Sequence, residues 1–379
     1  MKTWPLPALS LDLAIERQFA FVSAITRHFG GAEFLAAGDM GLVPGIGRPV
    51  ATAKAEAVLA DFFEQEDAVL VRGAGTGAIR SALFSAFGPG SRIFVHSAPV
   101  YPTTKTSFEM MNITPVEADF NDHAAAVLSY QHSSAAGALI QLARQKPDDS
   151  WDYAALIPAL KRAMPERPVI SDDNYAVMKV PRTGCQCGAD LSCFSMFKLL
   201  GPEGIGCVTG KRTFTEKIRS THYSGGVQVQ GCEAMEALRS IVYAPVAFAI
   251  QAKVCDEVVK RILCGEVKGV SDAFVVNAQS RVVIIELDEG LDAAAVIGKA
   301  GQFGATPYPV GSESRYEVAP LFYRVSGTFL KSDPSLSSRL IRINPMRAGA
   351  DTVLDILRRS LENVNYVPPA SAKIKPPSD

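Results

Sequence analysis

The chain has 379 residues, more than one hydrophobic core usually accommodates, so we expect a large domain and a smaller one. Its 38 basic and 39 acidic residues leave a formal net charge of −1, and no run of Lys or Arg forms the basic stripe that a nucleic-acid partner requires. Residues 1–21 lack the features of a signal peptide, and no apolar stretch is long enough to span a membrane, so we expect a cytoplasmic protein without a membrane partner.

Alternating helical and strand-like segments follow a stretch rich in Gly and Pro at residues 41–49. Apolar residues at helical spacing predict a helix over residues 51–64, and residues 73–87 predict a glycine loop that continues into a helix. Another helix is expected over residues 152–164. Short apolar runs predict strands at residues 68–71, 92–95, 138–142, 169–171 and 206–209. This alternation is typical of an α/β domain with a mostly parallel sheet covered by helices.

The pattern changes at about residue 244, where one long helical stretch is predicted to begin. A strand over residues 281–287, a helix over 292–301 and a final strand and helix within 340–361 are expected to follow. The end of the chain is Pro-rich and polar, so we expect it to be disordered. The predicted parts are an N-terminal arm (1–50), a large domain (51–243), a smaller C-terminal α/β domain (244–366) and a tail (367–379).

The segment richest in chemical signal is residues 188–210, GADLSCFSMFKLLGPEGIGCVTG. Its one lysine, Lys198, lies in an apolar context just before a predicted strand. A lysine that forms Schiff bases must spend time unprotonated, and partial burial beside another cation lowers its pKa towards that state. Ser195 could place a hydroxyl on a phosphate held beside this lysine. The alternative interpretation of Lys198 is an ordinary surface lysine whose stem lies along apolar neighbours.

A glycine-rich turn, GAGTGAIR at residues 73–80, follows a predicted strand and opens a predicted helix. Backbone N–H groups at such a helix N-terminus can hold a phosphate group. The dinucleotide fingerprint would require a glycine where this chain has Ala78, and the nucleoside-triphosphate loop fails because position 205 is Ile205. Both nucleotide interpretations are weakened, and a plain tight turn stays the alternative to a phosphate site.

Acidic residues end a short apolar strand in ISDDNY, residues 170–175. Open α/β sheets bind ligands beyond the carboxyl ends of their strands. A carboxylate against a pyridine nitrogen keeps that nitrogen protonated and the ring electron-withdrawing. We select Asp172 for this role, with Asp173 as second candidate because a shift of one residue turns a side chain to the other face. A helix cap or a turn is the structural alternative for these residues.

These segments, in their order along the chain, resemble the fold-type-I enzymes that use pyridoxal 5′-phosphate (PLP), particularly the cystathionine and methionine lyase branch. The resemblance implies the PLP-dependent transferase fold, with a mostly parallel sheet in the large domain. It also implies that Lys198 holds PLP as a Schiff base, that Asp172 pairs with the pyridinium nitrogen and that Tyr101 stacks on the ring. The further cofactor contacts that it implies are Gly75, Thr76, Gly77, Asp173, Tyr175 and Ser195.

Two arginines extend this resemblance. Arg342, in the segment LIRIN, matches the arginine that grips the substrate α-carboxylate through a bidentate contact, although Arg339 or Arg347 could be confused with it. Arg48 matches a phosphate-binding arginine contributed by the neighbouring subunit, which implies a homodimer with a shared active site. The alternative for either arginine is a surface ion pair of little energetic value.

Two positions depart from the lyase branch. That branch has a tyrosine two residues before the contributed arginine, where this chain has Ile46, and the difference argues against elimination. The asparagine found near the cofactor's ring hydroxyl in most fold-type-I enzymes is replaced here by RQKP at residues 144–147. Over nearly its whole length the sequence is similar to the bacterial YhfS proteins, which carry a general PLP assignment. The matching segments include GAGTGAIR, APVYPTT, DDNYAVMKV, FKLLGPEGIG and PLFYRVSGTF.

We therefore predict a PLP-dependent enzyme that acts at the α-carbon of an amino-acid-like substrate. Aminotransferase chemistry is favoured because it requires only Lys198 as proton shuttle and Arg342 as carboxylate clamp. A lyase that eliminates at Cβ or Cγ is the enzymatic alternative, and a non-enzymatic PLP-binding or zinc-binding protein is the alternative of another class. We expect no metal, because the cysteines lack the paired spacing of zinc knuckles; the closest group is Cys185, Cys187, Cys193 and Cys207.

Overall fold

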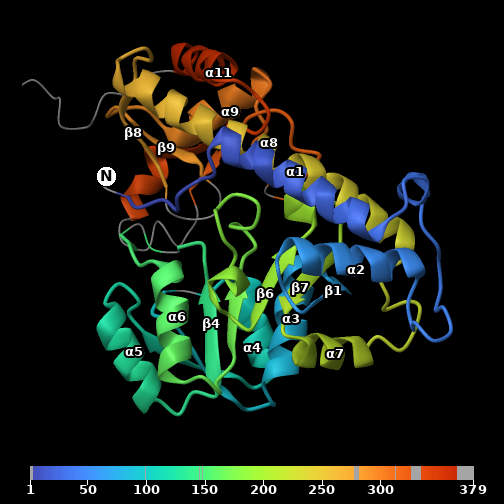
Figure 1. Ribbon diagram of the computed structural model, residues 1–379. Coiled ribbons are helices and arrows are strands. Elements are labelled where there is room, and N and C mark those ends of the chain that lie inside the picture. The colour runs from blue at the N-terminus through green and yellow to red at the C-terminus, as the bar shows by residue number, and fades with distance from the viewer. Residues whose placement is uncertain are drawn as a thin grey trace, which may run out of the picture.

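The computed structural model describes residues 3–98, 100–144, 146, 148–276, 281–311, 313–325 and 334–364. In it a larger α/β part lies beside a smaller one, with two long helices along their boundary (Figure 1). The tail predicted to be disordered, residues 367–379, lies outside the described residues.

Seven strands form the larger sheet, in the order β1-β7-β6-β5-β4-β2-β3. Neighbours are parallel except at β7, which runs antiparallel to both β1 and β6. The predicted mostly parallel sheet is confirmed, but two strands were missed. The exposed edge strand β3 has little apolar pattern, and β6 lies inside the lysine segment. The strands are β1 (Asp67–Arg72), β2 (Arg92–His96), β3 (Thr114–Ala118), β4 (Gly137–Gln141), β5 (Val169–Asp172), β6 (Leu191–Ser195) and β7 (Ile205–Gly210).

Helices cover both faces of this sheet. Along β4, Ala138 and Ile140 pack into one apolar cluster with α5 and α6, whereas Leu139 packs into another with α3 and α4. This alternation follows from the period of two residues in a strand, and burial on both faces explains why the strands are continuously apolar. The helices are α2 (Val50–Phe62), α3 (Ala74–Ala86), α4 (Pro102–Met110), α5 (His123–His132), α6 (Tyr153–Ala163) and α7 (Arg212–Ser220).

Two long helices, α1 (Leu11–His28) and α8 (Gly231–Leu263), lie side by side along the boundary (Figure 1). Helix α8 begins at Gly231 rather than at about residue 244, because Gln230 and Glu233 form a capping box there. It is long and apolar enough to span a membrane, but 56% of its most apolar window is buried inside the protein, as in a core helix.

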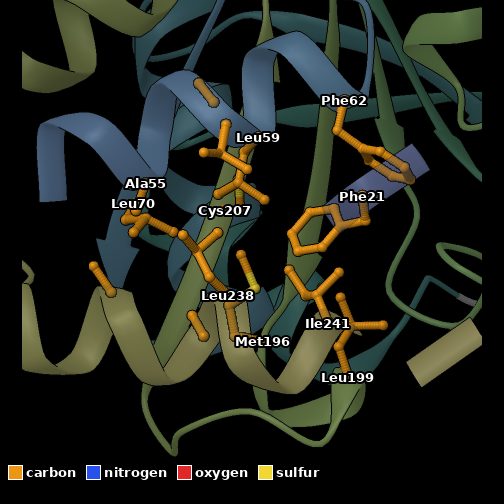
Figure 2. Packing of buried hydrophobic residues seen from close by; sticks show 14 of the residues in the cluster. Phe21, Ala55, Leu59, Phe62, Leu70, Met196, Leu199, Cys207, Leu238 and Ile241 are labelled. Atoms are coloured by element: carbon orange, nitrogen blue, oxygen red, sulfur yellow. The ribbon is translucent and has the colours of Figure 1, made fainter. Parts of the chain in front are cut away.

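The first half of α8 belongs to the core of the large part. Figure 2 shows Leu238 and Ile241 of α8 in one apolar cluster with Phe21 of α1 and with Leu59 and Phe62 of α2. The second half of α8 packs instead with the small sheet and its helices. The helix therefore links the two cores and carries contacts of both.

Four antiparallel strands form the smaller sheet, in the order β10-β11-β9-β8. The predicted strands and helices of this part are confirmed, while β8 and β10 were not predicted. Its strands are β8 (Val270–Val275), β9 (Val283–Leu287), β10 (Leu321–Arg324) and β11 (Leu340–Asn344), and its helices are α9 (Ala293–Gln302) and α11 (Ala350–Glu362). Short 3-10 turns occur at η1 (Glu33–Leu35), η2 (Cys185–Cys187), η3 (Phe197–Leu199) and η4 (Pro334–Ser338).

Candidate active site

The carboxyl ends of β4, β5 and β6 meet the N-terminus of α3 at one edge of the large sheet, which is where open α/β sheets bind ligands. A cavity of about 180 Å³ lies at this edge. The structure thus brings together most of the predicted site residues. Those that line the cavity are Gly75, Thr76, Tyr101, Asp172, Tyr175, Ser195 and Lys198.

Lys198 lies in the turn η3, directly after β6, and its amine faces two aromatic rings. The Nζ atom is 3.5 Å from the ring centroid of Tyr175 and 5.7 Å from that of Tyr101. Burial lowers the pKa of Lys198, while Tyr101 and Asp172 oppose that change. A lysine with a lowered pKa in a cavity is suited to act as a nucleophile and as a base.

Asp172 is the last residue of β5, and its carboxylate is buried in the cavity wall. Its Oδ1 atom accepts hydrogen bonds from the backbone N of Asn174 at 3.0 Å and from the Nδ2 of Asn174 at 2.7 Å. Burial raises the pKa of Asp172, and Asn174 and the charge of Lys198 lower it. A buried carboxylate of this kind favours a cationic partner in the cavity.

Asn174 is a site residue that the sequence reasoning missed. It lines the cavity, fixes the Asp172 carboxylate, and has a buried Oδ1 atom without a hydrogen-bond partner among the described residues. Gly75 makes room for it, because a Cβ atom at Gly75 would lie 2.0 Å from that Oδ1. In the sequence, the position of this amide residue two places after the acid that ends the strand could have indicated its role.

Asp173, the second candidate for the pyridinium partner, points away from the cavity. Its Oδ1 accepts from Ser171 Oγ at 2.5 Å, and its Oδ2 accepts from the backbone N of Gly184 at 2.8 Å. Burial raises the pKa of Asp173 to about 7. The predicted contact between Asp173 and the cofactor is therefore not supported by its position, because consecutive residues of a strand face opposite sides.

The glycine-rich turn lines one end of the cavity through Ala74, Gly75 and Thr76. Gly73 and Ala74 have φ of 95° and 53°, and their N–H groups donate to Gly204 O at 2.7 and 3.0 Å. The next residues at the N-terminus of α3, Gly75 and Thr76, line the cavity, where helix N–H groups can bind a phosphate. The Thr76 hydroxyl donates to Thr103 Oγ1 at 2.9 Å, and Ser195 lines the same space. Thr103 was not predicted, although it follows the predicted Tyr101 by two residues.

Gly77 does not line the cavity, so its predicted contact with the cofactor is not supported. A Cβ atom there would lie 1.9 Å from the carbonyl oxygen of Arg72, and the Gly77 N–H donates to Gly73 O at 2.8 Å. Gly77 therefore permits α3 to pack closely on the end of β1.

We expect Gly77→Ala to lower the free energy of unfolding by about 1–3 kcal/mol, because the new methyl group must displace backbone rather than a flexible side chain. Denaturant unfolding of the two proteins measures this loss. Gly88→Ala is the matched control, since no atom lies within 4 Å of a Cβ at Gly88. Equal stability of the two variants would contradict the packing role.

Tyr101 and Tyr175 form an aromatic wall beside the lysine. Tyr101 is the N-cap of α4, and Tyr175 lies in the turn that follows β5. Interaction with Tyr175, followed by burial, raises the pKa of Tyr101, while Lys198 lowers it. The Tyr101 phenol is thus kept neutral, and the rings of Tyr101 and Tyr175 are available to stack against a planar ligand.

The two predicted arginines lie outside the cavity. Arg48 Nε pairs with Glu56 Oε2 at 2.8 Å, within its own chain. Arg342 is buried on β11, opposite Tyr323 in the β10–β11 register, and its guanidinium is 5.3 Å from that ring centroid.

Arg144, the first residue of the RQKP stretch that replaces the family's asparagine, does not line the cavity. The Arg144 guanidinium donates from Nε and Nη2 to Trp151 O, at 3.0 and 2.6 Å, and contacts Trp4 O. Gln141, at the end of β4 and in register with Asp172, lines the cavity instead. Gln145 and Pro147 lie outside the described residues.

The cysteines do not form a zinc site among the residues that the structure describes, where no group of three or more His, Cys, Asp or Glu could hold a metal ion. Cys185 instead donates to Thr209 O at 3.2 Å, and burial raises its thiol pKa. Buried, protonated thiols are poor metal ligands. Those of the predicted cluster are free and buried: Cys185, Cys187, Cys193 and Cys207.

Comparisons with known proteins identify relatives of this chain. A family model described as YhfS-like, C-terminal domain, matches residues 256–357. Models of aminotransferase class I and II and of aminotransferase class V match residues 24–145 and 153–240. The uncharacterized protein YhfS of Escherichia coli (strain K12) is 49% identical over 364 residues, which cover 96% of this chain and 100% of that protein.

Solved structures extend the likeness to the fold. The crystal structure of the pyridoxal-5′-phosphate-dependent protein YhfS from Escherichia coli matches with a TM-score of 0.94 and 49% identity, over 96% of this chain and 100% of that chain. A putative cystathionine beta-lyase from Listeria innocua matches with a TM-score of 0.69 and 17% identity, over 93% and 94% of the two chains. A cystathionine gamma-lyase, CalE6 of Micromonospora echinospora, gives 0.65 and 16%, over 83% and 87%. At such identities the two lyases share the fold alone.

Proposed function

Because the chain belongs to the YhfS family of pyridoxal-5′-phosphate-dependent proteins, we propose that it is an enzyme that uses PLP at the α-carbon of an amino-acid-like substrate, by aminotransfer. The observation that carries this proposal is the convergence of Lys198 and Asp172 on one cavity that also receives the N-terminus of α3. An amine, a buried carboxylate and a phosphate-sized cup are the three features that PLP needs.

The residues of the cavity fit the cofactor. Lys198 would hold it covalently. Asp172 would pair with its protonated ring nitrogen, and that positive charge would offset the unfavourable burial of the carboxylate. The phosphate would bind at the N-terminus of α3 with Thr76 and Ser195. Tyr101 offers an aromatic face for the ring.

The bound cofactor draws electrons away from the substrate α-carbon and so makes its proton acidic. The Nζ atom of Lys198 would take up that proton and would give it back from the same side later in the transfer, which a lowered pKa permits at neutral pH. Asp172 would keep the ring nitrogen of the cofactor protonated. Arg342 is the proposed ligand of the substrate carboxylate, and its guanidinium lies 5.3 Å from the ring centroid of Tyr323 on the neighbouring strand.

Aminotransfer is preferred over elimination because Ile46 supplies no acid or base where the lyase branch has a tyrosine. The test incubates the PLP-loaded protein with a panel of L-amino acids, including sulfur-containing ones, with and without an α-keto acid. We expect amino groups to move to the keto acid without release of ammonia. Release of ammonia from a sulfur amino acid without a keto acid would establish the lyase alternative instead.

We also propose that two chains form a homodimer in which each lends Arg48 to the other's cavity. The surface around Arg48 supports this, because it exposes apolar side chains that a partner would cover. They are Leu35, Met40, Leu42 and Ile46.

Mixing two inactive variants tests the shared site. Arg48→Ala and Lys198→Ala lesions lie in different chains of a mixed dimer, so one of its two sites keeps both residues. We expect an unfolded and refolded equimolar mixture to recover about a quarter of the wild-type activity, because half of the dimers are mixed. If the mixture stays as inactive as either variant alone, each chain builds its own site.

A further inference from the structure

A second lysine with a largely covered side chain, Lys179, lies next to the candidate active site and has no part in the chemistry proposed above. Its Nζ atom is 4.6 Å from the ring centroid of Phe248 and 5.8 Å from that of Tyr175. The same Tyr175 ring has the Lys198 Nζ at 3.5 Å. One tyrosine ring is therefore in contact with both amines, and the two positive charges are close enough to interact.

The counter-ion of Lys179 comes from the C-terminal part of the chain. The Glu313 carboxylate contacts Lys179 Nζ, and its Oε1 accepts from Gln251 Nε2 at 3.0 Å. Gln251 in turn accepts from Arg347 Nη1 at 3.2 Å. Glu313 is 1% exposed, so this ion pair is shielded from solvent and from salt.

The loop that carries Glu313 is held by backbone hydrogen bonds to the carboxylate of Glu317. Its Oε1 atom accepts a hydrogen bond from the backbone N–H of Val310 at 2.6 Å, and its Oε2 atom accepts one from the backbone N–H of Glu313 at 2.6 Å. Glu313 has φ of 87°, a conformation that costs free energy for a residue with a side chain and persists only where surrounding structure imposes it. In the same loop Gly311 lies so close to Phe197 that a Cβ would be 2.2 Å from its ring. The loop thus touches the residue before Lys198 as well as Lys179.

We propose that Lys179 and Glu313 are positioning residues for the PLP site: their ion pair fixes the ring of Tyr175, and the ammonium of Lys179 favours the unprotonated form of the Lys198 nitrogen. This inference rests on the proposed function, since the nitrogen of Lys198 is the atom that would carry the cofactor. It also makes that nitrogen sensitive to the position of the C-terminal part, which supplies Glu313.

The charges around the two lysines support the assignment. Tyr101 and Asp172 favour the protonated form of Lys198. The ring of Tyr175 contacts the same amine through its face. Lys179 is the cation that opposes Tyr101 and Asp172. Burial first, and then the charges of Lys198 and Arg347, lower the pKa of Lys179, whereas the Glu313 carboxylate in contact with its Nζ atom favours the ammonium form.

The test is a pH titration of the visible absorbance of the PLP-loaded protein, whose midpoint reports the proton on the Lys198 nitrogen. Lys179→Met removes a positive charge and should raise the midpoint. Glu313→Gln leaves that charge uncompensated and should lower it, each by about 0.5–1 pH unit. In the double variant the two effects should cancel to within a few tenths of a unit.

Opposite shifts are the signature that a purely structural role would not produce. Lys161→Met is the matched control, because Lys161 pairs with the buried Asp190 at 2.9 Å at the far ends of the strands. It should destabilise the protein without moving the midpoint. Shifts in the same direction, no shift in either single variant, or an equal shift in the control would overturn the inference. A wild-type protein without any visible band would instead overturn the proposed function, and this inference with it.

Discussion

Lys198→Ala is expected to abolish covalent retention of PLP and to reduce turnover by at least about 10⁴-fold, because one side chain serves as both covalent anchor and proton carrier. The protein should stay folded, because Asp172 keeps its two hydrogen bonds from Asn174 when the amine is lost. Its visible absorbance should be lost after gel filtration, and a direct assay of amino transfer measures the second effect.

Two controls separate this result from a general loss of lysine. Lys198→Arg keeps a positive charge in the cavity but no nucleophilic amine, so it should be as inactive as the alanine variant. Lys105→Ala removes an exposed lysine of α4 that pairs with Glu109 at 4.0 Å, and it should behave as the wild type. If Lys198→Ala retained both the absorbance band and turnover, another residue would have to anchor the cofactor.

Asp172→Asn is expected to leave PLP bound but to slow turnover by about 10²–10⁴-fold. Asparagine has the size of aspartate and can still accept the hydrogen bonds of Asn174 at its carbonyl oxygen. It lacks the negative charge that holds a proton on the cofactor ring, and the electron demand at the substrate α-carbon falls accordingly. Absorbance after gel filtration measures retention, and steady-state kinetics measure the loss in kcat.

Asp173→Asn is the control for this experiment, because the neighbouring aspartate faces Ser171 and Gly184 rather than the cavity. We expect it to retain most of the activity and to alter stability instead. A larger loss of turnover for Asp173→Asn than for Asp172→Asn would reverse the assignment of the two residues.

Much of this site could be anticipated from the sequence because local signals mark it. The glycine turn before α3, the acid that ends β5 and the lysine after β6 each follow a strand, and parallel strands bring such positions to one edge. Which of two adjacent aspartates faces the cavity was open, since a one-residue uncertainty in the strand changes the face. The register of β5 with β4 and β6 places Asp172 at the cavity.

The parts that were not anticipated depend on tertiary contacts. Gly77 lies in the glycine-rich turn as a phosphate ligand would, yet its hydrogen atom is needed against Arg72. Lys179 follows Tyr175 by four residues in an irregular segment, and its partner Glu313 is distant along the chain. No periodicity in sequence connects two such residues, so only the folded chain brings them together.

The measurement that tests the central claim most directly is peptide mapping by mass spectrometry after borohydride reduction of the PLP-loaded protein. Reduction makes the link between cofactor and lysine permanent, so the modified peptide identifies the anchor. We predict a single modified site, at Lys198. Modification at Lys179 or at another lysine, or no modification of a protein that retains PLP, would contradict the account.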